Sequence, residues 1–288
     1  MKKILITGAA GQLGRALIKE YESEDVLLVL TEAVACDGME VMDITDPDAV
    51  STICEKHKPD VIINCAAATN VDGCEADEAG AYRINAEGVH NLAMMASEFG
   101  SKFFQISTDY VFSGSADEPY LEDDTPDPVS AYGRTKLAGE REALMCCSRT
   151  FLIRTEWLYG EGHNFVRTML KLAESRDEVS VVDDQIGSPT SAKELARLIH
   201  YLEGTENFGI YHGTCRGQCS WADLAETVFE ITGKAVRVER ISSEEYKKRN
   251  PKSAFRPAYS VLSHDRLDRL DPPFVMKEWR DALEEYLK

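Results

Sequence analysis

Short apolar runs alternate with longer amphipathic segments along the first half of the chain. The first run covers residues 4–6, a helix is expected from Gln12, and a second run covers residues 26–30, which gives β-α-β order. Further runs cover residues 61–63, 103–106 and 151–153, and further helices are expected from about Ala76 to Phe99 and after Ser130. Strands of this kind are typical of a parallel sheet that helices cover on both faces. The pattern therefore predicts an α/β fold with a doubly wound parallel sheet of the Rossmann type.

The regularity weakens after about Trp157, where loops such as residues 183–190 separate a few helices. No flexible linker divides the chain at this point. We therefore expect residues 1–156 to form mainly the sheet domain. Residues 157–288 are expected to form mainly a smaller C-terminal lobe, with some chain crossing back to the sheet. Ligands of open α/β sheets bind beyond the carboxyl ends of the strands, and we expect the lobe to pack there.

Composition and charge narrow the possible partners. The 288 residues include 50 acidic and 32 basic ones, which gives a net charge of −18, and no run of lysines or arginines interrupts this acidity. We therefore expect no nucleic-acid partner and no binding to an anionic membrane. No apolar stretch reaches membrane-spanning length and nothing resembles a signal peptide, so the expected location is the cytoplasm.

The cysteines and histidines give no sign of a metal site. The eight cysteines form no C-x-x-C pair, and the six histidines show no spacing typical of metal ligands. Neither a zinc site nor a disulfide framework is indicated. The sequence therefore predicts reduced thiols and no metal.

A glycine loop directly follows the first apolar run and begins the first helix. Gly8, Gly11 and Gly14 stand in the pattern G-x-x-G-x-x-G, with Gln12 and Leu13 between the last two. Glycines at these places let the backbone turn tightly and approach a pyrophosphate, whose charge then lies at the helix N-terminus. The alternative is a glycine turn that only packs a helix on a strand. The spacing favours a dinucleotide site of the short-chain dehydrogenase type.

Other residues near the expected strand ends could contact the dinucleotide. Glu32, just after the second run, could accept hydrogen bonds from the adenosine ribose and disfavour a 2′-phosphate, which favours NADH over NADPH. An exposed loop acid is the alternative reading of Glu32. Asp43 and Ile44 could contact the adenine. Small residues follow the third run, where they allow close approach to a cofactor; they include Ala67, Ala68 and Thr69.

Tyr132 and Lys136 lie at the start of an expected helix, and their i, i+4 spacing puts them on one face. A phenol with a pKa of ~10 is a poor acid-base catalyst at neutral pH, but a nearby ammonium group such as that of Lys136 stabilises the phenolate and lowers this pKa. Thr108 ends the strand before this helix, so its hydroxyl could bond the same carbonyl oxygen. A tyrosine and lysine at this spacing also occur by chance on surface helices. Together with the glycine loop, however, the three residues predict a Thr-Tyr-Lys catalytic triad.

The chain resembles the dTDP-4-dehydrorhamnose reductase family over nearly its whole length. Besides the glycine loop, the segments that carry the resemblance are residues 59–64, 71–72, 106–112, 157–160, 164–165, 181–190, 220–221 and 256–260. The resemblance implies reduction of dTDP-4-dehydro-L-rhamnose to dTDP-L-rhamnose with NADH or NADPH. It also implies that the first domain binds the NAD(P) cofactor and that the C-terminal lobe binds the substrate.

The resemblance also implies roles for single residues. Tyr132 would donate a proton as hydride reaches sugar C4, Lys136 would hold the nicotinamide ribose, and Thr108 would bond the carbonyl oxygen. Asp109 and Trp157 would position the sugar. The cofactor would be lined by Gly11, Gln12, Leu13, Asp43, Ile44, Ala67, Ala68 and Thr69.

Two candidates for the nucleotide-sugar side are Gln185 and Arg256, since a guanidinium suits a diphosphate. Alternative readings remain for several aromatic and basic residues. Trp157 could be a core aromatic, and Arg256 could form a surface ion pair. Trp221 and Phe165 are read as packing residues.

This chain departs from the family pattern in places. Glu156 stands where members usually carry a serine, and Ala68 stands where an aromatic residue or histidine is common. Some members bind magnesium at a dimer interface through a glutamate shortly after the glycine loop, whereas this chain has Arg15 and Ala16 there, which does not support magnesium. The expected oligomeric state is monomer or homodimer.

Other functions remain open on the same residues. The chain could be a reductase, epimerase or dehydratase for another nucleotide-linked deoxysugar, because the triad does not separate these activities. It could also be a non-catalytic regulatory relative that keeps the cofactor pocket. The presence of Thr108, Tyr132 and Lys136 argues against that last class.

Overall fold

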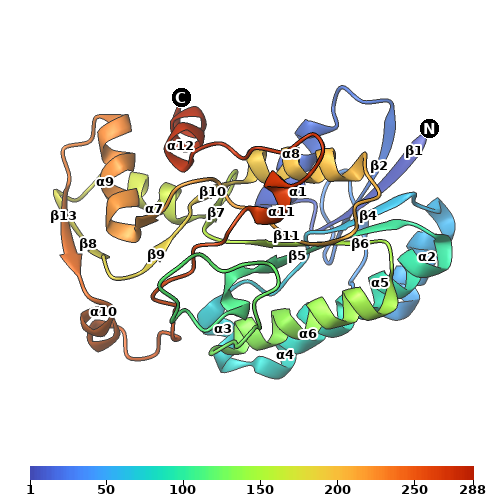
Figure 1. Cartoon of the computed structure of the whole chain (residues 1–288), viewed down its shortest axis with the longest axis horizontal. Coiled ribbons are helices and arrows are strands. Elements are labelled where there is room, and N and C mark those ends of the chain that lie inside the picture. Colours follow the sequence, from blue (N-terminus) through green and yellow to red (C-terminus); the bar gives the residue numbers. More distant parts are fainter.

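A seven-stranded parallel sheet forms the centre of the computed structural model, which describes residues 1–288 (Figure 1). The strand order is β11-β6-β5-β4-β1-β2-β3, so the chain winds outward in both directions from β1, as the sequence predicts. The strands are β1 (Lys2–Thr7), β2 (Val26–Glu32), β3 (Glu40–Val41), β4 (Val61–Asn64), β5 (Lys102–Thr108), β6 (Thr150–Thr155) and β11 (Gly209–His212).

Helices cover both faces of the sheet because successive strand residues point to opposite sides. Ile4 and Ile6 of β1 pack with α1 (Gln12–Glu20) and α8 (Ala192–Glu203) on one face. Leu5, between them, packs on the other face with α2 (Pro47–His57), α5 (Gly88–Phe99) and α6 (Ala131–Cys146). Strand β11 and helix α8, both from the second half of the chain, thus belong to the sheet layers.

The prediction of a single helix from about Ala76 to Phe99 is wrong in detail. The chain instead forms α3 (Val71–Ala76), α4 (Glu78–Tyr82), a π-helical turn η1 (Arg83–Glu87) and then α5. Asp77 interrupts the first part, since its carboxylate accepts a hydrogen bond from the backbone N–H of Gly80 and caps a new helix. The π-helical turn lies beside the expected cofactor site, as such turns often do.

The C-terminal lobe has its own apolar core beyond the carboxyl ends of the sheet strands (Figure 1). Three helices build it, namely α7 (Phe165–Leu172), α9 (Trp221–Thr232) and α12 (Trp279–Leu287). Three two-stranded sheets complete it, pairing β7 (Leu158–Tyr159) with β10 (Thr190–Ser191), β9 (Ile186–Gly187) with β12 (Cys219–Ser220), and β8 (Glu178–Val182) with β13 (Arg237–Ile241). Short helices α10 (Ser243–Arg249) and α11 (Asp265–Asp268) lie in the connecting segments.

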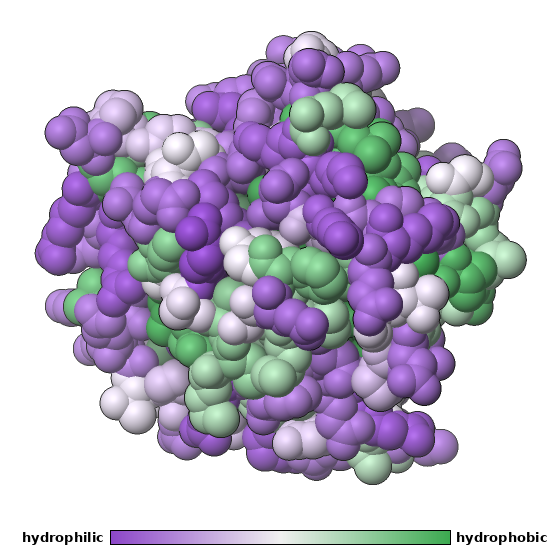
Figure 2. Space-filling model, turned by 90° about the vertical axis from the view of Figure 1, so that its right-hand side faces the viewer, coloured by the Kyte–Doolittle hydropathy of each residue, from purple (hydrophilic) through white to green (hydrophobic).

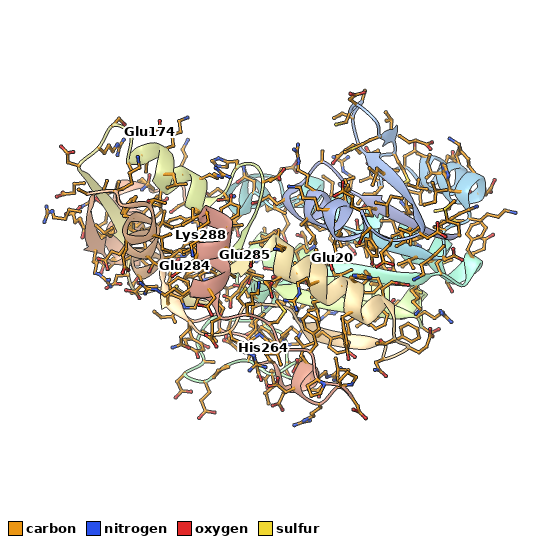
Figure 3. All side chains as sticks on the ribbon, turned by 90° about the horizontal axis from the view of Figure 1, so that it is seen from above. Glu20, Glu174, His264, Glu284, Glu285 and Lys288 are labelled. Atoms are coloured by element: carbon orange, nitrogen blue, oxygen red, sulfur yellow. The ribbon has the colours of Figure 1, made fainter.

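The last helix ties the lobe to the sheet domain. Glu285 of α12, which is labelled in Figure 3, pairs with Lys193 at the start of α8 and with Lys277. These two lysines lower the pKa of Glu285 to about 2.

One face of the molecule is mostly hydrophilic, with hydrophobic side chains scattered over it (Figure 2). None of the helices is both long enough and apolar enough to cross a membrane.

Candidate active site

The glycine loop lies tightly against the backbone around it. Gly8 has a φ of 59°, and a Cβ there would lie 2.8 Å from the backbone nitrogen of Ala66 after β4. A Cβ at Gly14 would lie 2.6 Å from the Cα of Ala9. These close approaches explain why glycine is needed at both positions.

The loop leaves the N-terminus of α1 open. Gly11 is the N-cap residue, no side chain caps the helix, and the first turn contains no acidic residue. The free N–H groups and the positive end of the helix dipole therefore suit an anion. This arrangement fits the pyrophosphate of a dinucleotide, which the loop residues and α1 would hold.

Glu32 lies at the end of β2 and contacts the glycine loop. Its Oε1 accepts a hydrogen bond of 2.8 Å from the backbone N–H of Ala10. The carboxylate thus braces the loop, and Glu32 also lines the adjoining cavity. Contact with a ribose through the second carboxylate oxygen stays a prediction.

A cavity of 1510 Å³ lies along the carboxyl ends of the sheet strands and reaches the C-terminal lobe. This volume exceeds the ~300–1,000 Å³ of a pocket for one small molecule, so two ligands fit the space better than one. Most residues that the sequence singles out line it, namely Gly8, Gly11, Gln12, Leu13, Glu32, Asp43, Ile44, Ala67, Ala68, Thr69, Thr108, Asp109, Tyr132, Lys136 and Trp157.

Three of the predicted site residues do not line this cavity. Gly14 packs against Ala9 inside the loop. Gln185 is buried and donates a hydrogen bond of 2.8 Å to the hydroxyl of Ser243. Arg256 lies 3.5 Å from the carboxylate of Asp72. It therefore forms an ion pair, which the sequence analysis gave as the alternative interpretation of this residue.

Thr108, Tyr132 and Lys136 come together at one wall of the cavity. Thr108 is the last residue of β5, and the other two lie in the first turns of α6. Lys136 is almost fully buried, and its Nζ donates a hydrogen bond of 2.6 Å to the backbone carbonyl of Ile106 in β5. The ring of Tyr110 packs edge-on against the ring of Tyr132, with centroids 5.4 Å apart. The triad is therefore held by neighbouring elements rather than by a loop.

Burial changes the acidity of both groups from α6. It lowers the pKa of Lys136 to about 8, although the negative charge of Glu140 opposes this shift. It raises the pKa of Tyr132 above its usual value, while the hydroxyl of Thr108 favours the phenolate. Burial is the largest contribution to the pKa of Tyr132, and lowering of this pKa by Lys136 stays a prediction. A raised pKa keeps the phenol protonated, as a proton donor requires.

Asn85 shapes the cofactor side and was not singled out from the sequence. It lies in the π-helical turn, where its side-chain amide bonds both the N–H and the carbonyl of Ala68, at 2.9 and 3.1 Å. It also donates to the hydroxyl of Thr135 on α6. Nothing local in the sequence separates this asparagine from others in the helical segment, since its role depends on three elements meeting.

Trp157 forms an aromatic wall with Trp221. Their ring centroids lie 3.6 Å apart with an interplanar angle of 14°, and the ring of Phe165 also packs against Trp221 at 4.6 Å. Trp157 has a φ of 46°, a conformation that costs energy for a bulky residue and that often marks functional sites. Trp221, read from the sequence as a packing residue, packs with the lobe core and also lines the cavity.

Two carboxyl groups lie near Thr108. Asp109 follows β5 and Glu156 follows β6, and both side chains are buried. Ser260 donates a hydrogen bond of 2.6 Å to Glu156. The resemblance marked Glu156 only as a departure, and Ser260 only as part of the 256–260 segment, so their proximity to the triad is a finding of the structure.

Known proteins share both this sequence and this fold. A family model described as the RmlD substrate binding domain matches residues 1–288. The spore coat polysaccharide biosynthesis protein SpsK of Bacillus subtilis is 40% identical over 290 residues, covering 100% of this chain and 98% of that protein.

Two solved structures are similar over nearly their full length. A dTDP-4-dehydrorhamnose reductase from Clostridium acetobutylicum has a TM-score of 0.93 and 44% identity, covering 99% of this chain and 98% of the other. A dTDP-4-dehydrorhamnose reductase from Bacillus anthracis, in complex with NADP, has a TM-score of 0.93 and 39% identity, covering 99% of each chain. With the full-length family match, these similarities show that the chain belongs to the RmlD substrate binding domain family.

Proposed function

We propose that this protein is an NAD(P)H-dependent reductase that converts dTDP-4-dehydro-L-rhamnose to dTDP-L-rhamnose. The observation that carries the proposal is the placement of Thr108, Tyr132 and Lys136 on the wall of the same cavity as the glycine loop. The Clostridium acetobutylicum and Bacillus anthracis relatives support this sugar nucleotide through their names, and the latter supports the cofactor through its bound NADP.

The chain's own residues suit each part of this reaction. The open N-terminus of α1 would hold the pyrophosphate, and Lys136 would hold the nicotinamide ribose. When bound, the reduced nicotinamide supplies a hydride to C4 of the sugar. Tyr132 would give its phenolic proton to the sugar oxygen as negative charge develops there, and Thr108 would bond the same oxygen.

The C-terminal lobe supports binding of the sugar nucleotide on the other side of the cavity. The stacked rings of Trp157 and Trp221 form a flat apolar surface from this lobe, against which a sugar can lie. We therefore propose residues 157–288 as the main substrate-binding part and residues 1–156 as the main cofactor-binding part. A cytoplasmic location and a monomeric or homodimeric state stay predictions.

Replacement of the proton donor tests the proposal. Tyr132→Phe should reduce kcat with dTDP-4-dehydrorhamnose by at least ~10²-fold, the usual contribution of a general acid, while NADH and NADPH still bind. Tyr110→Phe is the matched control, because it removes a neighbouring phenol from the same aromatic pair. Near-normal turnover of the Tyr132 variant, followed by absorbance of the nicotinamide and stereochemistry of the product, would exclude the proposed mechanism.

A further inference from the structure

Asp109 and Glu156 form a buried carboxyl pair at the edge of the cavity. Thr108 of β5 and Thr155 of β6 are register partners, so the residues that follow them leave the sheet side by side. Each of the two acidic residues is 2% exposed, and both line the cavity. The sheet itself therefore brings these two acids together.

Each carboxyl group makes only part of its possible hydrogen bonds. Asp109 accepts a bond of 2.8 Å from the hydroxyl of Thr108, and Glu156 accepts one from Ser260. The second oxygens, Oδ2 of Asp109 and Oε1 of Glu156, are buried and have no partner. A buried acceptor without a partner is costly, and a proton on one of the two acids would reduce that cost.

No positive charge compensates the pair. No lysine, arginine or histidine contributes to the acidity of either acid. Burial raises the pKa of Asp109 to about 7 and raises the pKa of Glu156, to which the charge of Asp109 also contributes. The titratable groups that face the pair from neighbouring elements are neutral at pH 7, namely Tyr110, Tyr132, Cys219 and Tyr259.

We propose that Asp109 and Glu156 hold one proton between them and supply it through the hydroxyl of Thr108 to refill Tyr132 after each reduction. This proposal rests on the proposed function. Tyr132 gives its proton to the sugar oxygen and is left as a phenolate. The hydroxyl proton of Thr108 then moves to that phenolate, while the carboxyl proton of Asp109 moves to Thr108. The pair is left with two negative charges and takes one proton from water, so each turnover consumes one solvent proton.

The direction of this transfer follows from the acidities. A buried phenolate is a stronger base than a carboxylate, so a carboxyl proton moves readily toward Tyr132. Two buried carboxylates repel each other without a cation, so the emptied pair recovers a proton. Glu156 acts as a positioning residue here. Its carboxylate raises the protonated fraction of Asp109, and it does not itself contact Tyr132.

Replacement of Glu156 tests the inference. Glu156→Gln keeps the size of the side chain and an acceptor for Ser260, but removes the second carboxyl. The pKa of Asp109 should then fall. The pH at which kcat declines should therefore be at least about one unit lower than in the unmodified protein. The expected result is a kcat reduced about tenfold at pH 7.5 and restored toward normal at pH 5.5.

A rapid-mixing experiment separates proton supply from a structural defect. Tyr132 holds its proton before the first turnover, so the first turnover of Glu156→Gln should keep its normal rate and later turnovers should be slow. The hydroxyl of Ser260 lowers the pKa of both acids, so Ser260→Ala should shift the pH profile in the opposite direction, toward higher pH, and serves if Glu156→Gln does not fold. Glu122→Gln is the matched control, because Glu122 is also buried and lies outside the cavity.

The outcomes are distinguishable from failure of the proposed function. A normal pH profile in both Glu156→Gln and Ser260→Ala, with no burst in Glu156→Gln, would overturn the proton-supply role, even if Tyr132→Phe is inactive. A uniform loss of kcat at every pH would overturn it as well, since that indicates a structural role. Normal turnover of Tyr132→Phe would instead overturn the proposed function.

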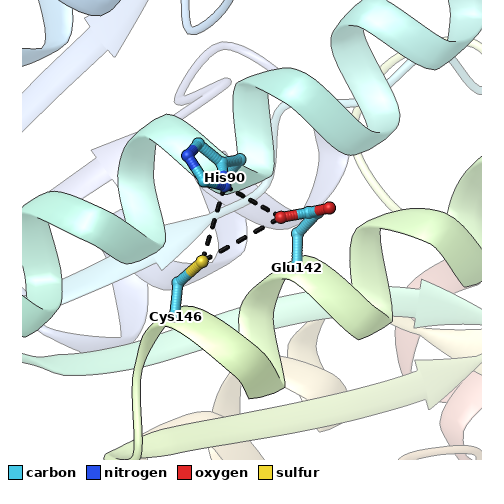
Figure 4. A group of neighbouring side chains, drawn as sticks. All are labelled: His90, Glu142 and Cys146. Atoms are coloured by element: carbon cyan, nitrogen blue, oxygen red, sulfur yellow. Dashed lines mark hydrogen bonds and ion pairs between the residues drawn. The ribbon is translucent and has the colours of Figure 1, made fainter.

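A separate observation concerns His90, Glu142 and Cys146 on the outer face of α5 and α6 (Figure 4). Nδ1 of His90 lies 2.8 Å from the carboxylate of Glu142 and 3.4 Å from Sγ of Cys146, and the last two atoms are 3.9 Å apart. Tetrahedral zinc at its usual bond lengths separates such ligands by about 3.3–3.6 Å. Glu142 and Cys146 are an i, i+4 pair, so both point to one side of α6.

The geometry points to a Zn²⁺ site at these three residues, with water as a fourth ligand. The thiolate and imidazole favour zinc over magnesium. The spacing of cysteines and histidines predicts no metal site, because His90 lies 52 residues from Glu142 and 56 from Cys146. Binding would require loss of the thiol proton, whose pKa is raised by burial and by Glu142, so affinity should rise with pH.

Calorimetric titration with Zn²⁺ and with Mg²⁺ tests this site. One Zn²⁺ per chain should bind, Mg²⁺ should not compete, and Co²⁺ should give a thiolate charge-transfer absorption. Cys146→Ser should weaken Zn²⁺ binding by at least ~10-fold, whereas Cys36→Ser, at another partly exposed thiol, should not. Absence of stoichiometric binding, or equal binding by the Cys146 variant, would overturn the assignment.

Discussion

The buried ion pair between Arg154 and Glu140 should be coupled strongly enough to measure. Arg154 of β6 donates two hydrogen bonds to Glu140 of α6, at 2.9 and 2.8 Å, and both side chains are nearly inaccessible. The hydroxyl of Ser107 donates a third bond to the same carboxylate. The pair therefore joins the strand that precedes Glu156, the strand that ends at Thr108, and the helix that carries Lys136.

Arg154→Met should leave Glu140 buried without its cation. Each hydrogen bond to a charged group contributes ~1.5–3 kcal/mol, so loss of two such bonds should lower the free energy of unfolding by about 3–6 kcal/mol. This agrees with the ~3–5 kcal/mol typical when one partner of a buried ion pair is removed. A loss of 4 kcal/mol corresponds to roughly a thousandfold change in the folding equilibrium, since about 1.4 kcal/mol is tenfold.

Urea unfolding of the single and double variants measures the coupling. Arg154→Met combined with Glu140→Leu should recover most of the lost stability, because no buried charge is left unpaired. The control is Arg134→Met, which breaks an equally short two-bond pair with Glu78 at the surface and should cost less than about 1 kcal/mol. A double variant as unstable as the sum of the single losses would refute the reasoning.

Three further predictions follow from other contacts. The affinity of the free protein for NADPH should fall as pH rises through about 8, because buried Lys136 loses its proton there. The fall should be absent in Lys136→Arg, whose side chain stays charged. Fluorescence titration with NADPH from pH 7 to 10 measures this affinity. Gly139→Ala should reduce the free energy of unfolding by about 1–3 kcal/mol, measured by heat or urea, because a Cβ there meets the backbone carbonyl oxygen of Asn85. Gly204→Ala is the control and should cost less, because its Cβ would lie at an ordinary contact distance of 3.4 Å from the backbone oxygen of Tyr201. Glu32→Ser should raise the ratio of kcat/KM for NADPH to that for NADH, because it removes a negative charge near the ribose; an unchanged ratio would show that Glu32 only braces the loop.

Local patterns in the sequence determined most of the fold. Alternation of apolar runs and amphipathic segments predicted β1, β2, β4, β5 and β6, because strand and helix periodicities are properties of neighbouring residues. The glycine spacing predicted the turn into α1, and the i, i+4 spacing predicted that Tyr132 and Lys136 share one helix face. The resemblance to a family added the sugar nucleotide, which these local patterns do not specify.

Only the tertiary structure decided which distant residues meet. The adjacency of β5 and β6 brings Asp109 next to Glu156, and the packing of α5 on α6 brings His90 next to Cys146. In the C-terminal lobe, Gln185 donates a hydrogen bond to Ser243 of α10 and does not line the cavity. These contacts join residues far apart in sequence, and they depend on strand order, register and helix packing. No local window of the chain contains that information, so a local pattern cannot predict them.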